Sequence, residues 1–177
     1  MPPPPNPVKP SKQRSEGLKP TGAVLSRDRT YRYRLWRTWG DGPRLGWIML
    51  NPSQADGQVD DPTLRRCVGF AQGWGYGGLE VVNLFAYRAS RPEVLRQVVD
   101  PIGPQNDRYL REMPDRVAAI VCAWGNGGAW GERDRVVRGL LGEYPQLYCL
   151  GRTQLGQPRH PLYCSHEQPL IAFEEGI

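Results

Sequence analysis

The sequence predicts an α/β fold of three layers (α/β/α), in which helices cover both faces of a four-stranded parallel sheet that carries an additional N-terminal antiparallel strand. Apolar, strand-like runs alternate with helix-like segments along most of the chain, a pattern that gives right-handed crossovers and parallel strands. The runs at 44–50 and 116–125 are almost continuously apolar, which is typical of strands buried on both faces. A chain of 177 residues is long enough for one such domain with a sizeable core.

The first 22 residues differ in composition from the rest of the chain. They contain seven prolines, four basic residues and one acidic residue, and a segment of this kind cannot bury enough apolar surface to become ordered. We therefore expect a disordered, proline-rich basic tail at 1–22 and a single folded domain at 23–177. Within that domain basic residues exceed acidic ones by only two, so its charge permits a polyanionic partner without requiring one.

The first expected elements are a strand, a turn, a buried strand and a helix. The segment 30–39 alternates partly between aromatic or apolar residues and arginines, which predicts a strand. The turn signal at 40–43 separates it from the buried strand at 44–50. A helix is expected from Pro62, because Asp61 is a good N-cap residue and proline fits the first helical turn.

The remaining elements alternate between strands and helices. They are expected as a strand, a short helix, a helical segment, a strand, a helix and a strand at 79–85, 92–99, 103–114, 116–125, 131–144 and 146–151. The helix at 131–144 is amphipathic. Its apolar side chains expected to face the sheet are Val136, Val137, Leu140 and Leu141.

Cysteine spacing and hydropathy exclude several classes of protein. The cysteines lack the close pairs of zinc or redox motifs, so we expect reduced, mostly buried thiols and no metal site. The longest apolar runs are far shorter than the roughly 20 residues of a membrane span. The proline-rich start also lacks the apolar region of a secretory signal. We expect a cytoplasmic protein without a membrane partner.

Four motifs stand where the predicted parallel strands end. They are Asn51-Pro52-Ser53, Asn83, Trp124-Gly125 and His160-Pro161. Because the carboxyl ends of parallel strands meet at one edge of a sheet, we expect these motifs to converge on a site. The glycine-rich segments beside two of them lack the spacing of a nucleotide-binding loop.

The order of these motifs resembles that of the uracil-DNA glycosylase superfamily, which has an Asp- or Asn-Pro loop first, an aromatic residue and an asparagine for the pyrimidine next, and a His-Pro loop last. The resemblance covers roughly residues 47–163. More narrowly, 51–89 and 156–163 resemble a bacterial and phage domain family of formerly unknown function, similar to a phage-defence DNA glycosylase that excises glucosylated hydroxymethylcytosine. The resemblance implies a uracil-DNA glycosylase-like fold and a monofunctional DNA glycosylase without a cofactor. Its partner would be double-stranded DNA with a flipped-out modified pyrimidine, and we expect a monomer.

The resemblance also implies roles for individual residues. Asn51 would orient the attacking water, with Asp56 as an acidic helper and Asp60 and Asp61 as alternatives. Asn83 would pair with the base. His160 would stabilise the departing base anion. The other base-binding residues would be Pro52, Ser53, Phe85 and Tyr87.

Each of these residues also has a simpler structural interpretation. Asn51 would start an Asx-turn, Asn83 would satisfy the backbone at a strand end, and His160 would cap a loop. Phe85 and Tyr87 would pack in the core. It is the convergence of the motifs, rather than any one residue, that favours a functional site.

Basic residues concentrate near the same loops, and phosphate contacts or solvated charge would explain them. The expected DNA-binding residues are Arg65, Arg66, Arg88, Arg152 and Arg159, with Leu162 and Tyr163 as wedges in the duplex. The three lysines all lie in the tail. Schiff-base chemistry is therefore not expected, and the product would be an intact abasic site.

Two other functions stay open from the sequence. A nucleoside or nucleotide N-glycosidase would act on small molecules and would have no affinity for DNA. A catalytically inactive nucleic-acid-binding module would keep its binding after Asn51→Ala. The basic loops favour a nucleic-acid partner, while the converging asparagines and histidine favour glycosidic chemistry.

Overall fold

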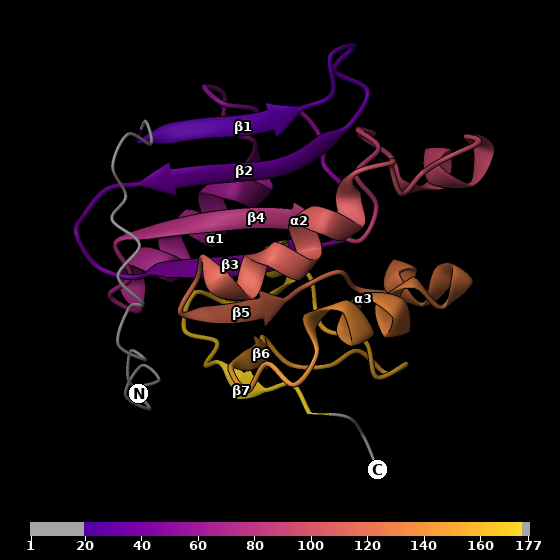
Figure 1. The fold of residues 1–177 in the computed structure, drawn as a ribbon. Coiled ribbons are helices and arrows are strands. Elements are labelled where there is room, and N and C mark those ends of the chain that lie inside the picture. Colours follow the sequence, from indigo (N-terminus) through magenta and orange to yellow (C-terminus); the bar gives the residue numbers. More distant parts are fainter. Residues whose placement is uncertain (1–19, 175–177) are drawn as a thin grey trace.

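The computed structural model describes residues 20–174, and the strands of this part of the chain form one mixed sheet (Figure 1). The strands are β1 (Thr21–Leu25), β2 (Arg32–Thr38), β3 (Arg44–Met49), β4 (Gly78–Asn83), β5 (Ala119–Cys122), β6 (Leu147–Cys149) and β7 (Ile171–Ala172). Their order across the sheet is β1-β2-β4-β3-β5-β6-β7. The four central strands β4, β3, β5 and β6 are parallel, whereas β1, β2 and β7 extend the sheet by antiparallel pairing.

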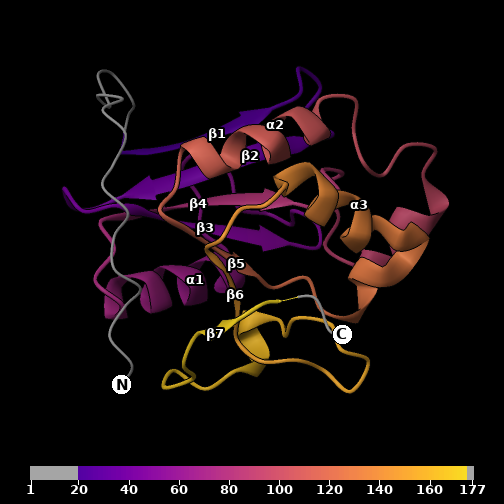
Figure 2. The ribbon, with the colours of Figure 1, turned by 60° about the horizontal axis from the view of Figure 1, so that its bottom comes forward.

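Helices pack on both faces of the sheet (Figure 2). The α-helices are α1 (Pro62–Gly73), α2 (Asn106–Glu112) and α3 (Arg133–Leu141), and the 3-10 helices are η1 (Pro92–Gln97), η2 (Met113–Asp115), η3 (Asn126–Glu132) and η4 (Pro161–Tyr163). Phe70 of α1 packs with Trp47 of β3 in the core of one face. Leu110 of α2 and Val137 of α3 pack with Ile48 in the core of the other face. Trp47 and Ile48 can serve both cores because successive residues of a strand point to opposite faces.

The direction of winding reverses at β3. The chain passes from β3 through α1 to β4 on one side, and then through α2 to β5 on the other side of β3. Two right-handed crossovers in opposite directions place α1 and α2 on opposite faces. The loops that leave β3 and its neighbours therefore diverge, and a crevice forms at the carboxyl ends of the strands, where α/β proteins bind ligands.

The parallel part of the sheet is confirmed, and so is the antiparallel strand expected at 30–39, which is β2. The outer strands β1 and β7 were not predicted. β1 is short and has a register shift between Val24 and Leu25, which interrupts the alternation on which a strand prediction depends. Thr21 and Gly22, which we expected in the tail, belong to β1, and residues 1–19 of that tail lie outside the described part of the chain.

Two helices test what the sequence predicted, α1 for its first residue and α3 for its buried face. α1 begins as expected, because the Asp61 side chain accepts a hydrogen bond from the Leu64 N–H at 2.8 Å. In α3, Val137 and Leu141 are buried, but Val136 is 47% exposed, so its expected orientation toward the sheet is wrong. A helix of nine residues presents only a narrow stripe to the sheet, and Val136 falls outside that stripe.

The cysteines are buried free thiols, as expected: Cys67, Cys122, Cys149 and Cys164. Burial raises the pKa of the Cys67 and Cys122 thiols well above the usual range, so both stay protonated and unreactive at neutral pH. Between residues 20 and 174, no helix is long and apolar enough to cross a membrane.

Candidate functional site

A cavity of about 280 Å³ opens at the carboxyl ends of β3 and β4. Its wall combines the loop after β3, the end of β4, Trp124 just after β5, and the segment around η4. The predicted residues that it brings together are Asn51, Ser53, Asp61, Asn83, Trp124, His160, Leu162 and Tyr163. Three polar residues of the wall that the sequence did not single out are Arg32, Thr63 and Ser90.

Asn51 joins two loops and leaves one acceptor free. Its Nδ2 donates hydrogen bonds to the carbonyl oxygens of Pro52 at 3.0 Å and Ala89 at 2.8 Å. Its Oδ1 accepts no hydrogen bond from any residue between 20 and 174. An Asx-turn would instead use the side-chain oxygen as an acceptor for backbone N–H groups. Asn51 therefore offers a fixed carbonyl oxygen to whatever occupies the cavity.

Asn83 ends β4 and is almost fully buried. Its Oδ1 accepts a hydrogen bond from Arg32 Nη2 at 3.3 Å, and Asn106 Nδ2 donates to its backbone carbonyl at 2.9 Å. The Nδ2 of Asn83 has no partner among the described residues. The amide thus lies in the cavity wall with its oxygen engaged and its N–H₂ group free.

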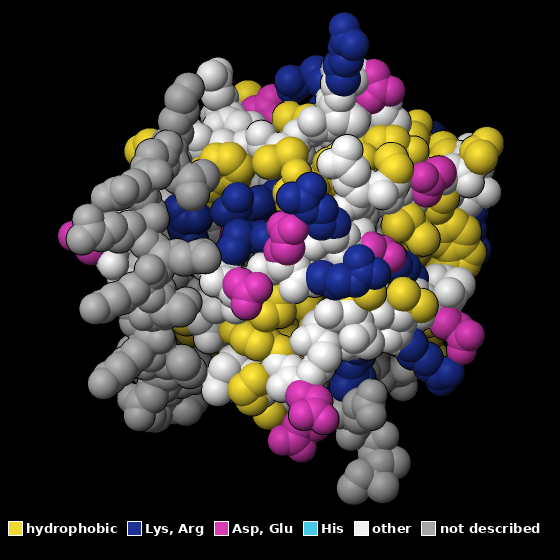
Figure 3. Space-filling model, in the orientation of Figure 1, with side chains coloured by type: hydrophobic (Ala, Val, Ile, Leu, Met, Phe, Trp, Pro, Cys, Tyr) yellow, Lys and Arg dark blue, Asp and Glu magenta, His cyan; other side chains and the backbone are white. Residues whose placement is uncertain are grey.

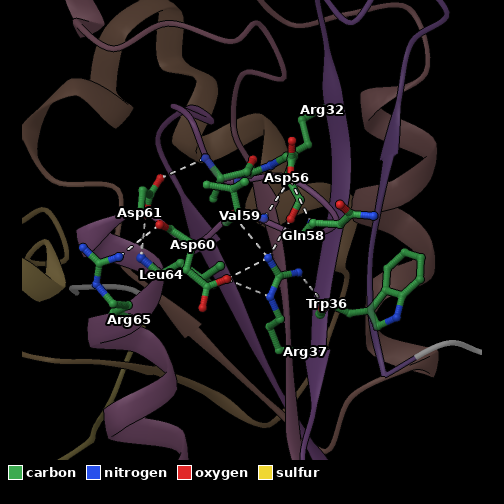
Figure 4. Close-up of polar contacts among 11 residues, drawn as sticks. Arg32, Trp36, Arg37, Asp56, Gln58, Val59, Asp60, Asp61, Leu64 and Arg65 are labelled. Carbon is green, nitrogen blue, oxygen red and sulfur yellow. Dashed lines mark hydrogen bonds and ion pairs between the residues drawn. The ribbon is translucent and has the colours of Figure 1, made fainter.

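Arg32 is a buried cation without an anionic partner. Its guanidinium reaches from β2 to the loop that leads into α1 (Figure 4), where Nη1 donates to the Ala55 carbonyl at 2.8 Å. Arg32 is 4% exposed, its Nε has no acceptor in the described part of the chain, and no carboxylate there lies within ion-pair distance. Burial lowers the pKa of Arg32 to about 10, against the opposing charge of Asp61. The group therefore stays charged at neutral pH.

His160 is a neutral donor with a defined tautomer. Its Nδ1 accepts the Leu162 N–H at 3.2 Å, so the proton of the neutral ring lies on Nε2. Burial lowers the pKa of His160 below its usual 6.5, and the nearby charge of Asp61 offsets part of this effect. At neutral pH the ring therefore presents an Nε2–H donor.

The buried aromatic side chain of the wall is Trp124, in place of the expected Phe85 and Tyr87. Trp124 is 2% exposed, and its Nε1 donates to Gln157 Oε1 at 2.8 Å. Its ring lies against Gly128, where an added Cβ would come within 2.0 Å of a ring atom. The glycine-rich segment after β5 therefore serves to seat Trp124.

Phe85 and Tyr87 lie elsewhere. Phe85 is a core residue that packs on Trp130 with ring centroids 5.2 Å apart, and Tyr87 contacts the edge of Tyr31. Neither lines the cavity, so core packing accounts for both. Pro52 is buried and supplies its carbonyl oxygen to Asn51, whereas Ser53 lies in the wall.

Of the acidic residues near Asn51, Asp61 lines the cavity and Asp56 does not. The Asp56 carboxylate accepts the N–H groups of residues 58–59 at 2.8 and 2.9 Å and pairs with Arg29 at 3.2 Å. These backbone hydrogen bonds lower the pKa of Asp56. Asp56 therefore stabilises a turn (Figure 4), and the structure does not place it as a helper of Asn51.

Several of the expected DNA-binding arginines hold loops together. Arg66 donates to the carbonyl oxygens of Pro161 and Cys164, and Arg159 donates to that of Tyr163 at 2.7 Å. These contacts fix the segment of η4 at the mouth of the cavity. Arg66 Nη1 also contacts His166 Nε2, so the first role of both arginines is structural.

The other three arginines differ in exposure. Arg152 is exposed and donates to the backbone carbonyls of Gly156 and Glu174. Arg88 is partly buried and makes a long contact of 3.4 Å with the Arg29 carbonyl. Arg65 is exposed at the start of α1 and donates to the Asp60 carbonyl at 3.0 Å. None of the three lines the cavity.

Leu162 and Tyr163 project at the cavity mouth. They are 45% and 77% exposed while also lining the cavity. Exposed apolar and aromatic side chains beside a cavity fit the wedge expected from the sequence, which stays a prediction.

The face that carries α2 and α3 has mixed charge. Figure 3 shows basic and acidic side chains next to one another across this face. Two of its ion pairs join Glu112 to Arg108 at 2.8 Å and to Arg116 at 3.3 Å. A face of this kind does not offer the one-sign surface that attracts a polyanion.

Between residues 20 and 174, no cluster of three or more His, Cys, Asp or Glu side chains suits a metal ion.

Comparisons with known proteins place the chain in a family. No curated protein and no solved structure matches the chain. Residues 32–162 match a family model described as "Protein of unknown function (DUF1643)". This segment begins at Arg32 and ends at Leu162, both in the cavity wall, and it covers most of the chain, which therefore belongs to the DUF1643 family.

Proposed function

We propose that the protein is a monofunctional DNA glycosylase, which hydrolyses the N-glycosidic bond of a modified or mismatched pyrimidine flipped out of double-stranded DNA. The observation that carries the proposal is the composition of the cavity wall. It combines one free side-chain carbonyl, on Asn51, with fixed N–H donors on His160 and Asn83. Sugar-bond hydrolysis needs such a pairing, namely an acceptor for the attacking water and donors for the departing base.

The three-layer arrangement supports the same proposal. Helices on both faces of a parallel sheet, with Asn-Pro, Asn and His-Pro loops meeting at one edge, resemble the uracil-DNA glycosylase superfamily. The cavity of about 280 Å³ lies at the small end of the range for ligand sites. It suits a single flipped base rather than a larger cofactor.

The mechanism follows from the atoms in the wall. The C1′–N1 bond breaks and its electron pair stays on the base, while a water molecule held by Asn51 Oδ1 adds to C1′. One proton of that water passes through solvent to the departing base. His160 Nε2–H and the Asn83 amide stabilise the negative charge that develops on the base. No lysine lies in the described part of the chain, so an intact abasic site is the product.

A second cavity supports a bulky substituent on the base. It measures about 420 Å³ and shares Leu50 and Pro92 with the first cavity. Trp130 and Glu93 also line it, and an aromatic face with a carboxylate is a suitable surface for a sugar. Glucosylated hydroxymethylcytosine of phage DNA is therefore the first modified base to test.

The test is a base-release assay. The wild type, Asn51→Ala and His160→Ala would be incubated with duplexes that contain uracil, a mismatched thymine, hydroxymethylcytosine or its glucosylated form, and then treated with alkali. We expect alkali-dependent cleavage by the wild type and a loss of about 100-fold or more in each variant. His166→Ala is the comparison variant: His166 does not line the cavity but contacts Arg66, so its substitution should lower base release much less than His160→Ala.

The same assay separates the alternatives. Release of base from free nucleosides, without release from DNA, would instead identify a small-molecule N-glycosidase. Binding to the duplexes that survives Asn51→Ala, with no release of any base, would identify a binding module and would contradict the proposal.

A further inference from the structure

The cavity wall contains hydrogen-bond donors whose orientations are fixed by their neighbours. The neutral ring of His160 carries its proton on Nε2, because its Nδ1 accepts a hydrogen bond from a backbone N–H. Asn83 has a free N–H₂ group because its oxygen is occupied by Arg32. Arg32 itself keeps a buried Nε–H that has no acceptor within residues 20–174. Against these donors, the free side-chain amide oxygen in the wall is that of Asn51.

The contact between Arg32 and Asn83 determines which way round the amide lies. A guanidinium offers only donors, and an amide offers a donor group and an acceptor group that exchange places when it rotates by 180°. A rotated Asn83 would set its N–H₂ group against the N–H groups of Arg32, with no acceptor between them. Burial of both residues removes the water that would relieve this mismatch. Asn83 is therefore held as a donor toward the cavity.

We propose that Arg32 determines base specificity by holding Asn83 in this orientation, so that the cavity accepts a pyrimidine with a hydrogen-bond acceptor at N3. Cytosine and its C5 derivatives have such an acceptor at N3, beside the O2 acceptor and the N4–H₂ donor of their pairing edge. Uracil and thymine carry a hydrogen at N3, which would meet the N–H₂ group of Asn83 and set two buried donors against each other. The inference rests on the proposed glycosylase function and adds to it the residue that selects the base.

Arg32 also acts on the charge of the departing base. When the C1′–N1 bond breaks, the electron pair on N1 spreads to O2, and the base becomes an anion until it takes up a proton. A buried guanidinium without a carboxylate partner stabilises that anion more than it stabilises the neutral base. The same residue therefore selects the base before the reaction and favours its departure during it.

The test is a binding measurement on duplexes that cannot react. A 2′-fluoroarabino sugar blocks formation of the sugar cation, and 5-hydroxymethylcytosine and 5-hydroxymethyluracil differ only in the pairing edge. Each would be placed opposite the same abasic-site analogue, so that neither has a pairing partner to lose. Fluorescence anisotropy should show that the wild type binds the cytosine duplex at least about tenfold more tightly, the usual effect of one unpaired buried donor.

Three variants separate specificity from folding. Arg32→Met should bring the affinity ratio to within about twofold of one, since the amide of Asn83 is then free to rotate. Arg37→Met removes a second buried arginine of the same strand that does not line the cavity, and should leave the ratio unchanged. Asn83→Asp replaces the donor by an acceptor of the same shape and should reverse the preference toward the uracil duplex.

The outcomes are distinct from those of the base-release assay. An equal affinity of the wild type for both duplexes would overturn the role of Arg32, and so would an unchanged ratio in folded Arg32→Met. If Arg32→Met fails to fold by circular dichroism, Asn83→Asp decides, and a retained cytosine preference there overturns the inference. Base release that ignores the pairing edge would contradict the inference while leaving the glycosylase proposal intact.

Discussion

Arg32 and Arg37 lie on the same strand, β2, and hold the same loop, but among the described residues only Arg37 has an ion-pair partner (Figure 4). Arg37 is 6% exposed and pairs with Asp60 at 2.8 Å, and its Nη2 also donates to the carbonyl oxygen of Asp56 at 2.6 Å. Arg32 is 4% exposed and donates to the Ala55 carbonyl, and no carboxylate of residues 20–174 lies within ion-pair distance of it. The first lies outside the cavity and the second lines it.

The comparison shows that the unpaired buried charge lies in the cavity wall. A buried charge without a partner is destabilising by several kcal/mol in general. Stability alone therefore does not explain an unpaired Arg32 when the paired Arg37 holds the same loop. Arg37 shows that the loop can be held by a fully paired residue. The missing partner of Arg32 is therefore best explained by a ligand that brings acceptors or negative charge.

The largest expected effect is on stability, and it separates the two arginines. Arg37→Met removes an ion pair and several backbone contacts, and should lower the free energy of unfolding by about 3 kcal/mol. Arg32→Met removes an unpaired charge together with one short hydrogen bond, so its cost should stay under about 1 kcal/mol. Urea denaturation of the two variants measures both values.

The result that contradicts this contrast is an equal loss in both variants. Arg32 would then be a structural residue like Arg37, and its position in the cavity wall would carry no functional meaning. Arg32→Lys provides the control for charge, because lysine keeps the cation but lacks the planar fork that reaches Ala55 and Asn83 together.

The parallel sheet was predictable from the sequence because its signals are local. The continuous apolar runs of β3 and β5 and the cap of α1 at Asp61 each lie within a few residues. The strand β7 was not predictable in this way, since it has two exposed residues and forms only through pairing with β6. Elements that depend on a distant partner leave little pattern of their own.

The site was predictable only where residues stand at strand ends. Asn51, Asn83 and His160 follow from the topology of the sheet, and the structure brings them to one cavity. Arg32 lies on β2, and the alternation of that strand predicts a solvent-facing arginine. The loop of residues 51–61 covers that position, and sequence patterns do not show which surface a loop will cover.

Arg65 and Arg66 on α1 form a second pair of neighbouring arginines, of which Arg66 is bound to backbone and Arg65 is exposed. Arg66→Met releases the backbone of η4 at Pro161 and Cys164, and should weaken duplex binding about tenfold through loss of two hydrogen bonds. Arg65 is exposed and its side chain makes one hydrogen bond, to the Asp60 carbonyl, so Arg65→Met should act mainly through charge and lower the slope of log affinity against log salt by about one. Anisotropy titrations at several salt concentrations distinguish the two.

The salt dependence of duplex binding decides whether Arg66 acts through the backbone of η4 or through phosphate. The loss caused by Arg66→Met should persist at high salt, because it comes from the position of Leu162 and Tyr163 rather than from phosphate attraction. If the loss instead disappears as salt rises, Arg66 contacts phosphate directly, and the assignment of a structural role is wrong.

The smallest expected effect is the pH dependence set by His160 and Asp61. Burial holds the pKa of His160 below 6.5, so the stability that the neutral ring contributes is complete above pH 6.5 and is lost as pH falls through the lowered value. Base release should fall in the same range, because protonation of Nδ1 removes the acceptor of the Leu162 N–H. Denaturation curves and release rates from pH 7.5 to 5 measure both.

Asp61→Asn sharpens this last measurement, because asparagine keeps the cap of α1 while removing the nearest charge. The Asp61 carboxylate raises the pKa of His160, so its removal should extend the fall in stability to lower pH and make the total loss larger. The same variant should change base release at pH 7.5 by no more than about threefold if Asn51 orients the water. A loss of about 100-fold at that pH would show that Asp61 is the general base. Asp61 would then act in the reaction itself and not only through its charge on His160.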